Sequence, residues 1–355
     1  MRFRKRPDTI SLANCLITIY DSQIPLIFQA LKPLPFRFIY NKMILNFSDI
    51  IFAILIIPSA IILKIYSRVG GKRLPVCRET LKKIGVYPIR DHYYQPLFND
   101  SHLLAPLSSD RNLPGLDLNV EYQLDLLSKI NYSSEINFHE KNNNSKNKLN
   151  FFLGNGSFES GDAEFLYSIV RHFKPRMIVE IGSGHSTKIA NQALAKNKSL
   201  NNILYKHICV EPYEMPWLSE MNVEVIRSRV ELCYPKLFTG LQRNDLLFID
   251  SSHIIRPQGD VLFEYLEILP TLNSGVIVHV HDIFTPKDYP DQWVRENVLF
   301  WNEQYLLEAL LSNSSRYKVI AALNFLKSNY YSQLVNVCPY LDPNRDPGSF
   351  YFQIQ

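Results

Sequence analysis

The chain has 355 residues, with 38 Lys and Arg against 34 Asp and Glu, for a formal net charge of +4. Residues 1–76 hold 11 of the basic and 3 of the acidic residues, a net +8, so the remainder carries −4. Because the basic excess lies beside apolar sequence, no nucleic-acid-binding surface is expected. The five cysteines are odd in number and widely spaced, which excludes a disulfide framework and a zinc spacing and favours a reducing, cytosolic compartment.

The N-terminal extension, residues 1–45, has no clear periodicity, and Met43 within it is a candidate start of the chain. A long apolar segment follows this extension. Ile50 to Leu63 are apolar except for Pro58 and Ser59. As a helix these residues reach only about 21 Å, whereas the hydrocarbon layer of a membrane is about 30 Å thick. Residues 47–66 approach a full span. Three interpretations stay open for residues 46–70: a transmembrane anchor, a re-entrant or interfacial helix bent at the proline, and a buried helix of a soluble protein.

Basic residues follow the apolar segment, at Lys64, Arg68, Lys72 and Arg73. If the segment lies in a membrane, these charges place the rest of the chain on the cytoplasmic side. Residues 71–150 then form a connecting or lid region with two predicted helices, Cys77 to Ile84 and Tyr122 to Ile130. The polar run KNNNSKNK, residues 141–148, predicts a boundary before a second domain at 151–355. The segment FESGD, residues 158–162, has two open interpretations: its hydroxyl and acids could contact the cofactor or the acceptor, or Ser160 could be the N-cap of a helix that extends to Val170.

The sequence MIVEIGSGHST, residues 177–187, predicts a strand, a glycine loop and the start of a helix. Glycines let a bulky ligand approach the backbone, and the helix start offers free N–H groups. The third glycine of a dinucleotide fingerprint is missing, since Thr187 stands at its position, and Glu180 precedes the loop. An acid there would repel a pyrophosphate. It suits a cationic nucleoside with an amino acid end, such as S-adenosylmethionine.

Three further apolar runs end on polar residues. Ile208 to Val210 end at Glu211, which lies 31 residues after Glu180, the length of one strand–helix–strand unit, and which can accept both ribose hydroxyls. Leu246 to Ile249 end at Asp250, and Val276 to Val280 end at His281 and Asp282. Each acid alone could be a helix N-cap. Taken together, four strands that end on acids predict a site at one edge of a parallel sheet.

The alternation of elements predicts an α/β domain with helices on both faces of the sheet. The expected strands lie near 177–181, 206–211, 223–227, 245–250, 275–281, 318–322 and 349–354. The expected helices lie near 187–197, 214–220, 257–269 and 297–312.

Residues 150–355 resemble class I S-adenosylmethionine-dependent methyltransferases. The motifs that carry the resemblance are VEIGSGHST (179–187), CVEP (209–212), LLFIDSSH (246–253) and GVIVHVHDIF (275–284). The resemblance implies a Rossmann-like fold with a mostly parallel seven-stranded sheet whose last strands are partly antiparallel. In this chain the membrane-associated helical region precedes that fold. The expected cofactor is S-adenosylmethionine, and the residues expected to bind it are Glu180, Gly182, Ser183, Gly184, Ser186, Thr187, Glu211 and Asp250.

The IDSSH and HVHDIF segments are similar to a bacterial subgroup of uncharacterised methyltransferases, many of which belong with surface polysaccharide or secondary metabolite pathways. The expected acceptor is therefore a glycan, a lipid-linked saccharide or a related small molecule, methylated on oxygen at the cytoplasmic face of the membrane. A homo-oligomer is compatible with the sequence. The alternative is a cofactor-binding or scaffold protein without catalytic activity.

An oxygen acceptor must lose a proton, and two mechanisms are open. In the first, His253 or His281 acts as general base. In the second, Asp250 and Asp282 hold a divalent cation such as Mg²⁺, which lowers the pKa of the hydroxyl group and orients it. His281 stands where related proteins that bind magnesium have an acid. The predicted catalytic residues are accordingly His253, His281 and Asp282, and the predicted metal ligands are Asp250 and Asp282.

Overall fold

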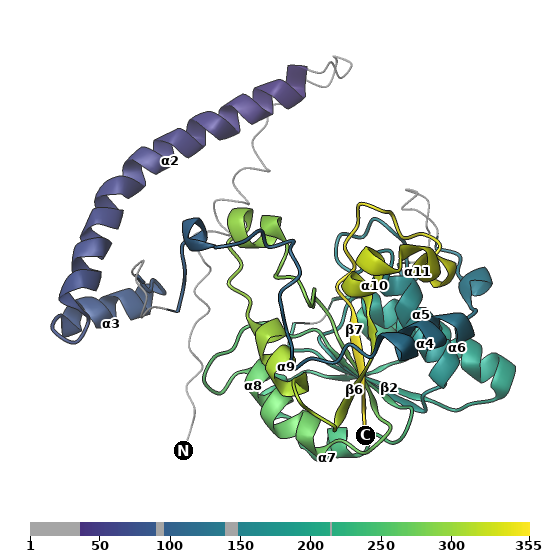
Figure 1. Cartoon of the computed structure of the whole chain (residues 1–355). Coiled ribbons are helices and arrows are strands. Elements are labelled where there is room, and N and C mark those ends of the chain that lie inside the picture. The colour runs from purple at the N-terminus through teal and green to yellow at the C-terminus, as the bar shows by residue number, and fades with distance from the viewer. Residues whose placement is uncertain (1–35, 90–95, 139–147, 214) are drawn as a thin grey trace. The chain divides into compact units, whose positions relative to one another are not determined.

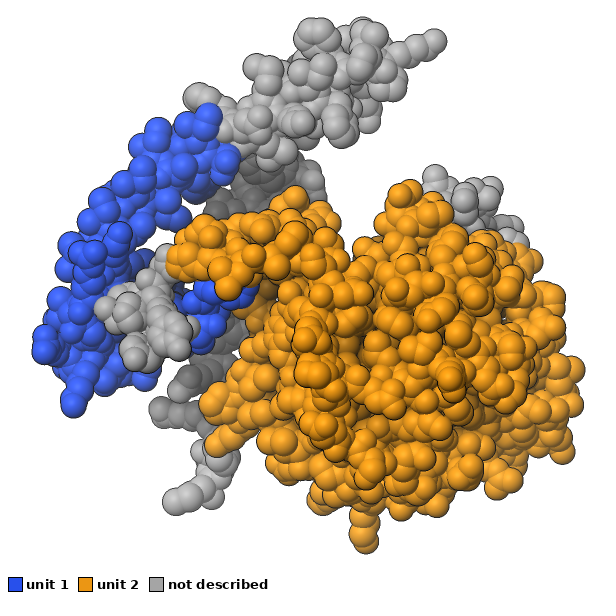
Figure 2. All heavy atoms as spheres, viewed as in Figure 1, with its two compact units in different colours: residues 1–98 blue, residues 99–355 orange. Residues whose placement is uncertain are grey.

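The computed structural model describes residues 36–89, 96–138, 148–213 and 215–355, with backbone only for 36–47. The chain divides into two compact units, residues 1–98 and 99–355 (Figure 2). The second unit contains the sheet, and it begins earlier than the boundary predicted at 150. The polar run that suggested that boundary lies almost wholly outside the described residues.

A seven-stranded sheet organises the second unit, in the order β3-β2-β1-β4-β5-β7-β6. Strands β1 to β5 are parallel, and β7 is antiparallel to both β5 and β6. This arrangement confirms the predicted Rossmann-like sheet with a late antiparallel strand. The strands are β1 Met177–Ile181, β2 Lys206–Val210, β3 Glu224–Ile226, β4 Leu246–Ile249, β5 Ile277–Val280, β6 Tyr317–Ala322 and β7 Phe350–Ile354.

Two apolar layers cover the sheet because side chains alternate along each strand. In β4, Leu246 and Phe248 belong to one core, and Leu247 and Ile249 belong to the other. Figure 1 shows the corresponding helices on the two sides of the sheet. One layer contains α4 Val120–Lys129, α5 Asp162–Phe173, α6 His185–Asn201, α10 Leu323–Asn329 and α11 Tyr331–Val337, and the other contains α7 Lys236–Thr239, α8 Asp260–Phe263 and α9 Glu303–Leu311.

The connecting region after residue 98 belongs to the sheet unit because it bonds to the far edge of the sheet. The Nδ2 group of Asn119 donates to the carbonyl of Val319 at 2.9 Å. The amide of Ala322 donates to Oε1 of Gln123 at 2.8 Å. Leu126 and Leu127 of α4 then pack into the core that contains α5 and α6. The linker pattern alone did not reveal these contacts, which join residues about 200 positions apart.

Several predicted helices have different limits in the structure. The helix expected at 214–220 is reduced to a short 3₁₀ turn, η4 Leu218–Glu220, because prolines at 212 and 216 disfavour a longer helix. The helix expected at 257–269 is α8 followed by a π-helical turn, η6 Glu264–Ile268, and a 3₁₀ turn, η7 Leu269–Thr271. The helix predicted from 297 begins at Glu303, and α5 is capped by Gly161 rather than Ser160.

The first unit contains the predicted apolar segment within one long helix, α2 Phe36–Val69, which includes Pro58. Its part from Ser48 to Val69 is 22 residues long, and 18 consecutive residues within it have a mean hydropathy of 2.3. That length spans about 33 Å as a helix, so by length and composition this part can cross a membrane. The short helix α3 Pro75–Ile84 follows, with proline in its first turn and Gly85 in the left-handed conformation after it.

Candidate active site

Gly182 joins the carboxyl ends of three strands. Its φ is +77°, and a Cβ atom at this position would lie 2.0 Å from the carbonyl oxygen of Asp250. The Gly182 amide donates to the carbonyl of Val210 at 3.1 Å, and the Asp250 amide donates to the carbonyl of Ile181 at 2.9 Å. These two bonds tie the loop after β1 to the ends of β2 and β4. Only glycine fits both the backbone angle and the close contact with Asp250.

Some residues predicted to contact the cofactor lie beneath the glycine loop. The Glu180 side chain is buried, and its Oε1 accepts a bond from Ser186 Oγ at 2.6 Å. Its Oε2 lies 3.1 Å from Nε2 of His207. The Thr187 hydroxyl, also buried, accepts from the Gly184 amide at 3.1 Å. Glu180, Ser186 and Thr187 therefore hold the loop in shape from below.

A pocket of about 520 Å³ opens at the carboxyl ends of β1, β2 and β4, a size that suits a nucleoside ligand. Glu211 lies on its wall, where its Oε2 accepts from the Ser183 amide at 3.0 Å and its Oε1 from the Tyr213 amide at 2.7 Å. The pocket thus includes three of the predicted cofactor residues, and it is lined by Ile181, Gly182, Val210, Glu211, Pro212, Tyr213, Arg229, Val230, Glu231, Asp250, Ser251, Ser252, Arg256 and Asp260.

Carboxylates and histidines gather beside this pocket. The Nε2 atom of His253 lies 3.4 Å from Oδ1 of Asp250 and 3.6 Å from Oδ2 of Asp282. The Nδ1 atom of His281 lies 3.6 Å from Oδ1 of Asp250 and 3.4 Å from Oδ1 of Asp282. The structure therefore brings together all the predicted catalytic residues. Asp282 has a φ of +59°, a strained value for a residue other than glycine that is typical of functional sites.

A second layer of acids holds the two histidines. Oδ2 of Asp162 lies 3.9 Å from Nε2 of His281, and Oε2 of Glu303 lies 2.8 Å from Nδ1 of His253. The sequence predicts that Asp162, in the segment FESGD, could contact the cofactor or the acceptor, and it predicts no role for Glu303. Asp162 follows Gly161 at the start of α5, where it resembles a helix-capping acid. Glu303 lies 50 residues beyond His253, so only the tertiary structure shows the pair.

The charged groups of the cluster shift one another's pKa values. Burial acts to raise the pKa of Asp250, but His281 and His253 outweigh it and hold that pKa below its ordinary value. Burial and the neighbouring Asp250 raise the pKa of Asp282. Burial acts to lower the pKa values of both histidines, but the surrounding carboxylates raise them well above the ordinary value.

Donor atoms of Asp250, His253 and Asp282 all lie within 4.8 Å of one another. Two carboxylates and an imidazole at this spacing are suitable ligands for a divalent cation. A second group with the same spacing, Glu180, His207 and Cys209, is fully buried below the loop. Burial and the nearby Glu180 charge raise the pKa of the Cys209 thiol, so it stays protonated and is a poor ligand.

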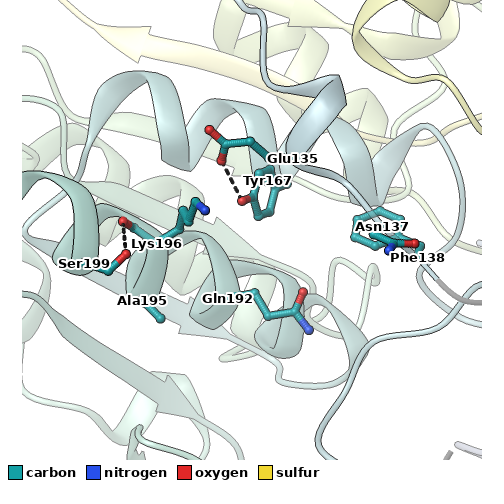
Figure 3. A pocket seen from close by; sticks show the side chains of 8 residues that line it. All are labelled: Glu135, Asn137, Phe138, Tyr167, Gln192, Ala195, Lys196 and Ser199. Atoms are coloured by element: carbon teal, nitrogen blue, oxygen red, sulfur yellow. Dashed lines mark hydrogen bonds between the residues drawn. The ribbon is translucent and has the colours of Figure 1, made fainter.

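Another hollow lies between α5 and the second half of α6, and Figure 3 shows its lining. Its acid, Glu135, is bonded to the Tyr167 hydroxyl at 2.9 Å and to Arg171 at 2.7 Å. Because these bonds already engage the acid, the hollow offers no free carboxylate to a ligand. The residues that line it are Glu135, Asn137, Phe138, Tyr167, Gln192, Ala195, Lys196 and Ser199.

The sheet order, the glycine loop after β1 and the acid after β2 define a Rossmann-like domain that binds a nucleoside cofactor. Residues 179–283 match the family model of a methyltransferase domain. An uncharacterized protein of Archaeoglobus fulgidus is 29% identical over 164 residues, which cover 43% of this chain and 73% of that protein. The part of the chain that holds the site, residues 179–283, is therefore similar to a methyltransferase domain.

Two solved structures of cmcI are also similar. One, with SAH, gives a TM-score of 0.34 at 11% identity over 63% of this chain and 90% of that one. The other, with Mg and SAM, gives a TM-score of 0.30 at 13% identity over 56% of this chain and 72% of that one.

Proposed function

We propose that this methyltransferase transfers the methyl group to a hydroxyl of a glycan, a lipid-linked saccharide or a related small acceptor. The observation that carries the proposal is the cluster of Asp250, His253 and Asp282 beside the cofactor pocket. An oxygen acceptor needs a group that takes its proton, and His253 is placed to do so. In the reaction the carbon–sulfur bond of the donor breaks, a carbon–oxygen bond forms, and the acceptor proton moves to Nε2 of His253 in its neutral form. Because the neighbouring carboxylates raise the pKa of His253, Nε2 must first release its own proton to solvent.

The cofactor site in this proposal is the pocket at the ends of β1, β2 and β4. Gly182 and Gly184 let the donor approach the backbone, and Ser183 is positioned by Glu211, which would also hold the ribose hydroxyls. Asp250 borders both this pocket and the cluster. It can therefore orient the donor relative to the acceptor, which is the main contribution that a protein makes to a direct displacement.

Asp250 and Asp282 would hold Mg²⁺ in this proposal. The cation, when bound, lowers the pKa of an acceptor hydroxyl and orients it. Nδ1 of His281 lies within 3.6 Å of both carboxylates, and its Nε2 lies 3.9 Å from Asp162, so it balances the charge of the acids. Its role here is to position them rather than to meet the acceptor.

A membrane location rests on α2. The part from Ser48 to Val69 is long and apolar enough for a span, and Lys72 and Arg73 follow it. We place the methyltransferase domain on the cytoplasmic side, next to lipid-linked acceptors. Carbonate extraction and protease protection of the full chain test this placement. Release of the chain by carbonate would refute the span, and protection of the methyltransferase domain in inside-out vesicles would refute its side.

The acceptor class is tested with S-adenosylmethionine that carries a labelled methyl group, the full chain, and lipid extracts or polysaccharide from the source cells. We expect label in a base-stable methyl ether of the saccharide fraction and no label with Asp282→Ala. Label only in protein or in a base-labile ester would contradict the proposed acceptor. No transfer by a chain that binds the donor would favour the alternative, a scaffold without catalytic activity.

A further inference from the structure

Three consecutive residues contact His253 from three directions. The indole ring of Trp301 packs on the imidazole, with ring centroids 4.2 Å apart and planes inclined by 37°. The amides of Asn302 and Glu303 donate to the carbonyl oxygen of His253 at 3.0 and 3.2 Å. The Glu303 carboxylate lies 2.8 Å from Nδ1. The ring face, the backbone and one ring nitrogen of His253 are therefore all held by the start of α9.

The backbone of His253 needs this support. Its φ is +59°, in the left-handed region that residues other than glycine rarely adopt. The first N–H groups of a helix have no partner within the helix, and at the start of α9 they bind the His253 carbonyl. The side-chain oxygen of Asn302 also accepts from the Ile255 amide at 2.6 Å. The backbone is thus held directly after the strained residue, at the His253 carbonyl and at the Ile255 amide.

Glu303 is itself fixed in one orientation. It is fully buried, and its Oε1 accepts from the Tyr265 hydroxyl at 3.0 Å while its Oε2 faces the imidazole. Burial, with Glu303 and Glu264 nearby, raises the pKa of Tyr265 well above its usual value, so the phenol keeps its proton and remains a donor. Both carboxylate oxygens of Glu303 are therefore engaged, and among the residues that the structure describes its charged-group partner is Nδ1 of His253.

We infer that Glu303 is a positioning residue, which keeps a proton on Nδ1 of His253 and so presents Nε2 to Asp250, Asp282 and the acceptor. The inference deepens the proposed function and rests on it for the role of His253. A carboxylate that orients a histidine through Nδ1 is a common device in general base catalysis and in metal sites. The segment WNE, residues 301–303, thereby gains a role that its sequence alone did not indicate.

Proton NMR of the full chain, labelled with ¹⁵N-histidine, tests the bond directly and needs neither cofactor nor acceptor. We expect one slowly exchanging, strongly downfield proton bonded to Nδ1, assigned to His253 by its loss in His253→Gln. In Glu303→Gln the signal should move upfield and exchange faster, because a neutral amide is a weaker acceptor. In Glu303→Asp it should persist with a smaller upfield shift, since the shorter carboxylate lengthens the bond.

Glu264→Gln is the matched control. Glu264 is equally buried, but its Oε2 accepts from Ser251, and no hydrogen bond between described residues joins it to His253. Burial, with Glu303 and Asp260 nearby, raises its pKa well above the usual value, so a neutral amide replaces a neutral acid. The downfield signal should be unchanged in this variant. A change equal to that of Glu303→Gln would mean that the signal reports general packing, and it would overturn the inference.

An absent signal in the intact chain, or an unchanged one in Glu303→Gln, would also overturn the inference. If Glu303→Gln does not fold, Glu303→Asp decides in the same way, and an unchanged signal in that variant would overturn the inference. Failure of the proposed function is a separate result: the intact chain would bind no S-adenosylmethionine. Because Glu303 does not line the cofactor pocket, Glu303→Gln should bind the cofactor as tightly as the intact chain.

Discussion

Replacement of Gly182 by alanine should destabilise the methyltransferase domain more than any conservative surface change. The residue has a φ of +77°, and an added Cβ would lie 2.0 Å from the Asp250 carbonyl. The left-handed conformation costs about 1–2 kcal/mol for a residue with Cβ. Overpacking against backbone adds about 1–3 kcal/mol, and the reduced freedom of the unfolded chain returns about 0.4–1 kcal/mol. The net loss in free energy of unfolding is about 1–5 kcal/mol.

Urea denaturation followed by tryptophan fluorescence measures this loss in the right part of the chain. All 3 tryptophans, Trp217, Trp293 and Trp301, lie in the unit that contains the sheet. Fluorescence therefore reports on that unit even when the full chain is studied in detergent. The Gly182→Ala variant should show a lower midpoint with an unchanged slope.

Gly184→Ala provides the control, because it changes the same residue type two positions later. A Cβ there meets no atom within 4 Å, and the backbone is extended, with a φ of −171°. The stability of this variant should stay within about 1 kcal/mol of the parent chain, the remaining cost being that of alanine at an N-cap. Equal stabilities for Gly182→Ala and the parent chain would refute the contact between the loop and β4.

Three other substitutions test separate parts of the structure. Asp245 accepts bonds from the amides of Arg176, Met177 and Gln242, so Asp245→Ala should lower the free energy of unfolding by about 3 kcal/mol in urea denaturation; a loss below about 1 kcal/mol would contradict this. Burial raises the pKa of Glu164 from 4.5 to about 7, so the stability that its neutral form contributes is full below pH 4.5 and is lost as the pH rises through 7. The free energy of unfolding of the parent chain, relative to that of Glu164→Gln, should therefore fall by about 3 kcal/mol between these limits. A difference that stays constant with pH would refute the raised pKa. Asp282→Asn should weaken Mg²⁺ binding at least about tenfold in calorimetry while cofactor binding persists; unchanged Mg²⁺ affinity would remove Asp282 as a ligand.

The strand ends were predictable from sequence because their signal is local. Each of β2, β4 and β5 ends directly before a polar residue, whereas Glu180 lies inside β1. In a parallel sheet those ends meet at one edge. Glu211, Asp250 and Asp282 could therefore be assigned to one site without a structure. The glycine spacing likewise depends only on adjacent residues.

The remaining features depend on contacts between distant residues. Whether Glu180 faces the ligand or the interior depends on His207, which lies on the next strand, and the pattern of apolar residues around Glu180 does not distinguish the two. The bond between Gln123 and Ala322 assigns α4 to the sheet unit, although a polar linker follows that helix in sequence. The pair of Glu303 and His253 is invisible for the same reason.

The central claim is that the pocket at the ends of β1, β2 and β4 is a methyl-donor site. Titration calorimetry of the full chain with S-adenosylmethionine tests this claim most directly. We predict binding at one site, no binding of NAD, and about tenfold to hundredfold weaker binding in Glu211→Ala. Glu224→Ala is the control, since this exposed acid on β3 pairs with Lys206 outside the pocket. Absence of S-adenosylmethionine binding by the folded chain, or equal affinities in the two variants, would contradict the assignment.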